Sequence, residues 1–267
     1  MLQAMISSYL IGRTILQPYF ERLHRFCLEA MNFGGNADNV KRSGEIWVIH
    51  RLAQFLSDDE IAIVFDVGAH VGNYSLEVLS GFGKKLLLYI FEPSKNTFYL
   101  LRQNLASYQN VKFFNFGFGE NDETAVLYSD KNLSALSSVY DRKLEHVRIE
   151  MKFKEEIKLR RLSNFCLENG INHIHLLKLD VEGNEFNVLK GAEELVNARS
   201  IDLIQFEFGG CNIDSRTFFR DFYYFLKPNY QIYRIVKNGI APITKYNESC
   251  EIFMTVNYLA VSKNKQI

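Results

Sequence analysis

The sequence predicts an α/β fold in which a mostly parallel sheet is covered by helices on both faces. Between residues 61 and 208, short and almost continuously apolar runs alternate with stretches of helical periodicity, which is typical of strands buried on both faces. Near the end of the chain two further apolar runs have no helix-sized pattern between them, which predicts an antiparallel pair. Counting both regions, we expect a seven-stranded sheet that ends in this pair.

The first part of the chain is predicted to be helical. We expect residues 1–56 to form a helical N-terminal extension, and residues 57–267 to form the domain that contains the sheet. The Gly- and Asn-rich segment 32–39 separates two helices, of which the second covers about residues 45–56. Pro18 is expected in the first turn of the earlier helix, where its missing N–H does no harm.

The elements of the sheet domain follow from its hydrophobic pattern. The seven strands are expected at residues 61–65, 86–91, 111–114, 174–179, 201–208, 230–236 and 252–261. Helices are expected over residues 73–79, 94–105, 185–196 and 216–226. Residues 123–159 have no helical pattern, and "IEMKFKEEIKL" (149–159) alternates apolar with charged residues. This alternation predicts a half-exposed strand at a margin of the sheet.

Composition and charge restrict the class of partner. The 267 residues include 31 basic and 31 acidic side chains, so no net charge favours nucleic acid or an anionic membrane. A small molecule or a glycan is the expected partner. Four cysteines lack C-x-x-C spacing, which predicts free thiols in a reducing, cytoplasmic compartment. Gly12 and Arg13 interrupt the apolar start of the chain, so no membrane span is expected.

The stretch "VFDVGAHVGNYS" (64–75) joins a buried strand to a helix through two glycines. Its G-x-x-x-G spacing lacks the middle glycine that admits a pyrophosphate, which disfavours NAD and FAD. Asp66 precedes the first glycine and would favour a cationic ligand, and Glu92 ends the next strand, where a carboxylate accepts ribose hydroxyls. A ribose and a positive centre without phosphates describe S-adenosyl-L-methionine. The simpler interpretation is a tight turn without a ligand.

A second unusual segment is "LLKLDVEGNEF" (176–186). Lys178 and Asp180 share one face of a strand, and Asp180 lies at its carboxyl end, where ligands bind in such sheets. Asp180 and Glu182 are therefore candidates for the base that takes a hydroxyl proton, with Lys178 tuning Asp180. A Mg²⁺ site at Asp180 and Glu207 remains the open alternative. Glu185 is more simply explained by the dipole of the following helix.

These motifs together resemble the FkbM family of S-adenosylmethionine-dependent methyltransferases over residues 44–208. The match rests on "SGE" (43–45), "FDVGAHVGNYS" (65–75), "FEPS" (91–94), "FGFGEND" (116–122) and "KLDVEGNEFNVLKGA" (178–192). The resemblance implies a Rossmann-like class I methyltransferase fold and methylation of hydroxyl oxygens, of sugars in glycans or glycolipids and of polyketides. It implies cofactor contacts by Asp66, Gly68, His70, Gly72, Asn73, Tyr74, Glu92, Asn115, Gly117 and Ser138. His70 stands where the family usually has Asn.

Other interpretations remain beside the leading one, an O-methyltransferase of a sugar, glycan or other small natural product. A methyltransferase-like module could bind without turnover. A nucleic-acid methyltransferase is disfavoured because the chain lacks an N-P-P-Y-like tetrapeptide and a basic excess. His173 and His175 share a strand face, but on its amino side, away from the rim. The N-terminal helices are expected either to cap the pocket or to form a homodimer.

Overall fold

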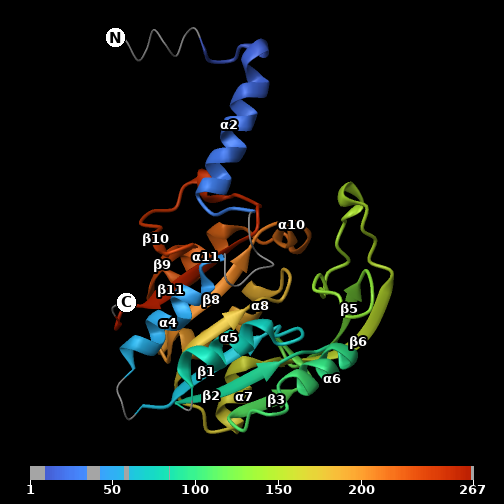
Figure 1. Ribbon diagram of the computed structural model, residues 1–267, viewed down its shortest axis with the longest axis vertical. Coiled ribbons are helices and arrows are strands. Elements are labelled where there is room, and N and C mark those ends of the chain that lie inside the picture. Colours follow the sequence, from blue (N-terminus) through green and yellow to red (C-terminus); the bar gives the residue numbers. More distant parts are fainter. Residues whose placement is uncertain (1–9, 35–42, 57–59, 84, 266–267) are drawn as a thin grey trace.

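The main sheet of the protein has eight strands, one more than expected (Figure 1). The computed structural model describes residues 10–34, 43–56, 60–83 and 85–265. In spatial order the strands are β3 (Val111–Phe114), β2 (Leu86–Phe91), β1 (Ala62–Val67), β7 (Ile174–Leu179), β8 (Ile201–Phe208), β11 (Val256–Ser262), β9 (Tyr230–Val236) and β10 (Gly239–Pro242). The predicted α/β architecture with a mostly parallel sheet is confirmed, and the fold is Rossmann-like.

The direction of the strands determines where their carboxyl ends meet. β3, β2, β1, β7 and β8 are parallel neighbours, so the carboxyl ends of all of them lie along one rim. β11 is antiparallel to β9, as the last two apolar runs predicted, and it is also antiparallel to β8. The unexpected β10 pairs with β9 as an antiparallel edge strand. Its Pro242 fits this position, because an edge strand can lack one N–H donor.

A second, three-stranded sheet lies beside the main one. It contains β4 (Gly117–Gly119), β6 (Phe153–Arg161) and β5 (Glu123–Ser129), in that order. β6 confirms the half-exposed strand predicted within "IEMKFKEEIKL", but its predicted position at a margin of the sheet was wrong, because it is the middle strand of this second sheet. The apolar side chains of its alternating pattern, Ile157 and Leu159, pack with Leu127 in a small core of their own.

Helices cover both faces of the main sheet, as predicted. On one face, α4 (Glu45–Phe55), α5 (Asn73–Phe82) and α6 (Lys95–Asn104) bury apolar side chains against β1 and β2. The other face packs against α7 (Leu162–Glu168), α8 (Glu185–Gly191), α9 (Glu193–Asn197) and α11 (Phe219–Leu226). Sequence analysis missed α7, and the single helix that it expected over 185–196 is divided into α8 and α9.

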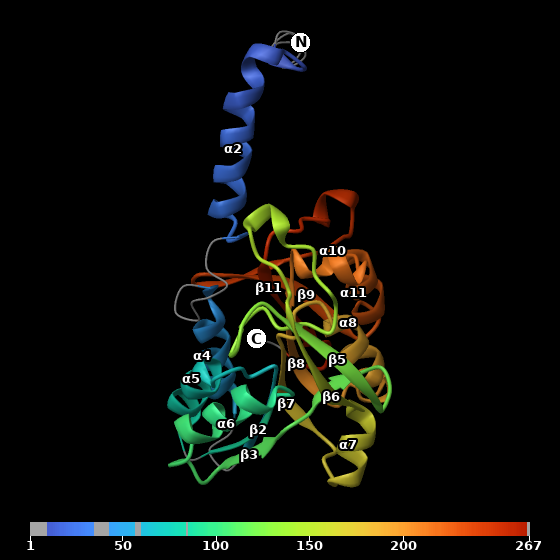
Figure 2. The ribbon, with the colours of Figure 1, turned by 90° about the vertical axis from the view of Figure 1, so that its right-hand side faces the viewer.

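The two N-terminal helices behave differently. α4 packs against α5 and contributes Val48, Ile49 and Leu52 to the core. By contrast α2 (Gln17–Ala30), which follows the short helix η1 (Thr14–Leu16), extends away from the body (Figures 1 and 2). Pro18 lies in the first turn of α2, as predicted. Residues 35–39 of the expected break lie outside the described residues. That residues 1–56 form a unit of their own stays a prediction.

Among the described residues, none of the helices combines the length and the apolarity that crossing a bilayer requires.

The contact between α8 and β4, which joins the two sheets, depends on Gly191. A Cβ atom there would lie 2.1 Å from the carbonyl oxygen of Gly119. We expect Gly191→Ala to lower the free energy of unfolding by about 2 kcal/mol, because α8 must move away from β4. Urea unfolding measures this loss. The matched control is Gly239→Ala, where a Cβ would meet nothing within 4 Å; equal stability of the two variants would contradict the account.

Candidate active site

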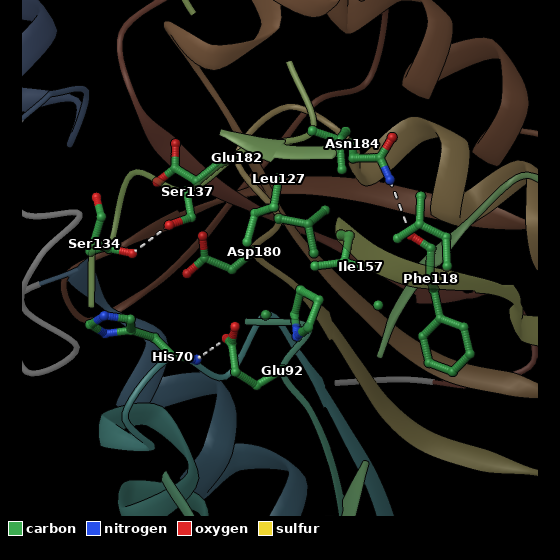
Figure 3. Close-up of a pocket in the computed structure, with 17 residues that line it drawn as sticks. His70, Glu92, Phe118, Leu127, Ser134, Ser137, Ile157, Asp180, Glu182 and Asn184 are labelled. Atoms are coloured by element: carbon green, nitrogen blue, oxygen red, sulfur yellow. Dashed lines mark hydrogen bonds between the residues drawn. The ribbon is translucent and has the colours of Figure 1, made fainter. Parts of the chain in front are cut away.

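Two cavities open at the carboxyl rim of the parallel strands. The Glu92 cavity, about 580 Å³, lies between the end of β2 and the second sheet. The Glu207 cavity, about 1010 Å³, lies between α5, the end of β8 and the loop that contains Ala135 and Leu136. Both are lined by the same five residues where they meet: Gly68, His70, Ala135, Asp180 and Glu182. Figure 3 shows Asp180 and Glu182 in the first of these cavities.

Glu92 is held at the end of β2 by backbone groups. One carboxylate oxygen accepts the N–H of His70 at 3.0 Å (Figure 3), and the other accepts the N–H of Ser94 at 2.9 Å. His70 has a φ of 49°, a left-handed conformation in which Asn and His are enriched. Its Nε2 lies 3.1 Å from the carbonyl oxygen of Leu133 and so carries the proton. Burial raises the pKa of Glu92 to about 8.

The two glycines of the first motif have different roles. Gly68 has a φ of 80°, and a Cβ on it would lie 1.8 Å from the carbonyl oxygen of Asp180. Only glycine therefore lets the ends of β1 and β7 approach this closely. Gly72 lines neither cavity. A Cβ there would lie 2.9 Å from Leu101, so this glycine serves the turn into α5 and its packing against α6.

The second sheet forms the apolar wall of the Glu92 cavity. Phe118, Leu127, Ile157 and Leu159 face the cavity together with Pro93. Polar groups on this side come from residues that sequence analysis did not select: Ser134, Ser137 and Asn184. Asn184 donates a hydrogen bond to the carbonyl of Phe118 at 3.0 Å (Figure 3). Asn184 lies within the motif of residues 178–192, but nothing in the sequence indicated that it, Ser134 and Ser137 would line a cavity, because they approach it only after the two sheets have packed.

Several of the predicted contact residues lie outside the Glu92 cavity. Asn115 donates its amide hydrogens to the carbonyls of Glu92 and Pro93, at 2.9 and 3.0 Å. Ser138 is fully buried and donates to the carbonyl of Glu182 at 2.7 Å. Neither side chain lines either cavity, so both support its walls instead. Gly117 does line the Glu92 cavity, whereas Asn73 and Tyr74 line the Glu207 cavity.

A buried ion cluster lies beneath Asp180. The Nζ of Lys178 lies 3.0 Å from the carboxylate of Asp180 and 3.5 Å from that of Asp66, and 4.8 Å from the centre of the Tyr74 ring. Burial alone would lower the pKa of Lys178, but the carboxylates of Asp180, Asp66 and Glu45 raise it above its ordinary range. The lysine therefore stays charged.

Asp66 has a different position from the one expected for a ligand-binding acid. It is fully buried, lines neither cavity, and accepts a hydrogen bond from Ser75 at 2.6 Å. Its carboxylate is thus a partner of Lys178. The expectation that Asp66 faces a cationic ligand is corrected by this geometry, because the positive charge beside it belongs to the protein.

Glu45 of α4 also belongs to the site, although sequence analysis gave it no role. Its carboxylate accepts hydrogen bonds from Ser43 and Gln205, both at 2.7 Å, and Gln205 in turn accepts one from Tyr74 at 3.2 Å. Glu45 lines the Glu207 cavity. The N-terminal segment therefore contributes a wall of this cavity through α4.

The turn after β7 is shaped by three acids in different ways. Glu182 has a φ of 52°, and its carboxylate forms an ion pair of 2.5 Å with the buried Arg142. Burial, and then the nearby Asp180, raise the pKa of Glu182 to about 8, although Arg142 opposes this. Glu185 accepts the backbone N–H groups of Val181 and Gly183, at 2.9 and 3.0 Å. It thereby holds the turn, in keeping with its predicted structural role.

Two groups of side chains have ligand atoms close enough to share a metal ion. In the described residues they are Glu182, Glu207 and Cys211, and, on the amino side of β7, His173, His175 and Asp202. Nδ1 of His175 accepts the N–H of Ile63 at 2.9 Å, so its Nε2 carries the proton and donates to Glu60 at 3.0 Å. His175 therefore has no free lone pair for a metal and is structural.

Comparison with known proteins identifies the family. The model of the methyltransferase FkbM domain matches residues 66–233, which include most of the first motif, all of the second, and the ends of β1, β2 and β7. The chain belongs to the FkbM methyltransferase family. Residues 66–233 are therefore a methyltransferase FkbM domain, as the motifs predicted.

Individual relatives are more distant. The chain is 29% identical over 157 residues to methyltransferase sdnD of Sordaria araneosa, covering 49% of this chain and 60% of that protein. It is 21% identical over 167 residues to the 2-O-methyltransferase NoeI of Sinorhizobium fredii, covering 59% and 68%. The FkbM methyltransferase structure from Methylobacillus flagellatus is 16% identical, with a TM-score of 0.44, over 77% of this chain and 45% of that one. The chain spans about three fifths of the length of the first curated relatives.

The buried acids predict how stability depends on pH. Glu92 has a folded-state pKa of about 8, against 4.5 in the unfolded chain, and the pKa of Glu182 is raised as well. Between these values the folded protein holds protons that the unfolded chain has lost, so its stability falls as pH rises from about 5 to about 8. Urea unfolding of the ligand-free protein across this range measures the slope. Glu92→Gln should reduce the slope, because the other buried acids still contribute, and stability that rises with pH would contradict the assignment.

Proposed function

We propose that this methyltransferase moves a methyl group from S-adenosyl-L-methionine to a hydroxyl oxygen of a sugar, glycan or other small natural product. The observation that carries the proposal is that the Glu92 and Glu207 cavities meet at Asp180 and Glu182. A donor bound in the first cavity and an acceptor bound in the second would face each other at these carboxylates, and alignment is the main requirement of such a transfer.

The lining of the Glu92 cavity fits an adenosyl nucleoside. Each oxygen of the Glu92 carboxylate accepts one backbone N–H and keeps a further lone pair for a ribose hydroxyl. The wall of Phe118, Leu127 and Ile157 suits the faces of an adenine ring. The described lining contains no Lys or Arg, which disfavours a phosphate-bearing cofactor. S-adenosyl-L-methionine, when bound, supplies a methyl group activated by a sulfonium.

The chain itself contributes a base and its support. The side chain of Asp180 is 39% exposed and borders both cavities. It is the group placed to take the acceptor's hydroxyl proton, and Glu182 is a second proton acceptor beside it. Lys178 then acts as a positioning residue, since its ammonium holds the Asp180 carboxylate and is buried. The printed name of NoeI, a 2-O-methyltransferase, supports a hydroxyl as the acceptor.

The cofactor assignment is tested by binding. We expect Glu92→Ala to weaken the binding of S-adenosylhomocysteine by about a hundredfold, because the hydrogen bonds between the Glu92 carboxyl group and the ribose are lost. Isothermal titration calorimetry measures this change directly. An affinity equal to that of the parent protein would show that the ribose does not lie on Glu92.

Asp180→Asn is the matched variant that tests the methyl-transfer step. It should bind S-adenosylhomocysteine within about threefold of the parent, yet transfer labelled methyl groups to a panel of mono- and oligosaccharides at least about a hundredfold more slowly. An unchanged transfer rate would remove Asp180 from its role as base. Loss of binding as well would indicate damage to the cofactor cavity.

We also propose that the protein is a cytoplasmic homodimer that pairs through α2. The four cysteines are free, which supports a reducing compartment. Tyr19, Leu23 and Phe26 form an apolar stripe on α2 and are 67%, 55% and 66% exposed. Arg22 and Glu29 flank this stripe on one side, seven residues apart. In an antiparallel pair of two copies, Arg22 of each copy would face Glu29 of the other.

A charge swap tests this dimer. Arg22→Glu should raise the dissociation constant of the dimer at least about tenfold, because two attractive contacts become repulsive. Adding Glu29→Arg to the same chain should restore the parent value. Sedimentation equilibrium measures both. A monomeric parent protein, or a double variant as weak as the single one, would contradict the arrangement, and binding of the parent to lipid vesicles through α2 would do so as well.

A further inference from the structure

Glu207 is a buried acid without a partner. It lies near the carboxyl end of β8, is 7% exposed and lines the cavity named after it. Among the described residues its carboxyl group takes part in no hydrogen bond and in no ion pair. Buried carboxyl groups are normally paired or hydrogen-bonded. The Glu207 carboxyl group is therefore free to take a partner from what enters the cavity.

The surrounding charges define the kind of partner. Glu45, Asp180 and Glu182 line the same cavity. The two cationic side chains in its described lining, Arg142 and Lys178, already form ion pairs. Arg142 contacts Glu182 and, at 3.8 Å, Asp214. Lys178 contacts Asp180 and Asp66. The carboxyl groups of this cavity therefore outnumber its cations. Burial, and then the neighbouring acids, raise the pKa of Glu207 well above its ordinary value.

We propose that Glu207 binds an ammonium group of the methyl acceptor, which makes an amino sugar or a similar amino alcohol the substrate class. The proposal rests on the proposed function, because it concerns the acceptor's side of that site. An ammonium would supply both the hydrogen bonds and the positive charge that this carboxyl group lacks. The attacked hydroxyl would lie on the other side of the acceptor, toward Asp180.

A divalent metal ion fits this position less well. Glu182, Glu207 and Cys211 have ligand atoms within 4.8 Å of one another. However, the Glu182 carboxylate already binds the guanidinium of Arg142, and burial raises the pKa of the Cys211 thiol. Mg²⁺ prefers oxygen ligands that are free of other cations. An ammonium needs only Glu207 and tolerates the neighbouring ion pair.

Two sugars of similar shape but different charge test the proposal. The protein is first saturated with S-adenosylhomocysteine, and D-glucosamine and D-glucose are then titrated near neutral pH and followed by ligand-detected NMR. We expect glucosamine to bind at least about tenfold more tightly than glucose. Glu207→Gln should reduce this preference to within about twofold. Its affinity for S-adenosylhomocysteine should stay at the parent value, because Glu207 does not line the Glu92 cavity.

Glu123→Gln is the matched control, since it neutralises an exposed acid on β5, and it should keep the full preference. Equal affinity of the two sugars for the parent protein would overturn the proposal, as would a preference that survives Glu207→Gln. Competition by MgCl₂ in the parent but not in Glu207→Gln would identify a metal site instead. Failure of S-adenosylhomocysteine to bind in the first step would overturn the proposed function itself.

Discussion

The buried ammonium of Lys178 is the interaction on which the site depends. Asp66 and Lys178 are register partners on the neighbouring strands β1 and β7, and the lysine also holds Asp180 at the rim. Without this charge, the carboxylate of Asp66 would be buried unpaired, at a cost of several kcal/mol. The same ammonium thus stabilises the centre of the sheet and fixes the carboxylate that borders both cavities.

The turn after β7 places the acids next to this buried cluster at the boundary of the two open cavities. Gly68 lets the backbone of Asp180 approach β1, and the Glu185 carboxylate fixes the turn through backbone N–H groups. The loop between β5 and β6 then reaches the turn from the second sheet, where Ser138 and Arg142 both contact Glu182. Segments that are far apart in the sequence therefore meet at Glu182, and the two cavities share their boundary there.

Much of the fold could be predicted because its signals are local. Apolar runs identified the strands, and acids at the strand ends identified Glu92 and Asp180 as rim residues. Contacts across the chain were not predictable in this way. Glu45 and Arg142 reach the site from distant elements, and β5 and β6 form a sheet of their own. The partner of a buried acid was not predictable either, because the sequence does not show whether the Asp66 carboxylate faces a ligand or a lysine on the next strand.

A crystal structure of the protein with S-adenosylhomocysteine tests the central claim most directly. The account predicts ribose hydroxyls within hydrogen-bond distance of the Glu92 carboxylate, adenine against the second sheet, and the sulfur facing Asp180 at the boundary of the two cavities. An adenosyl group bound in the Glu207 cavity, beside Tyr74 and Glu45, would contradict it. So would a sulfur that points away from Asp180.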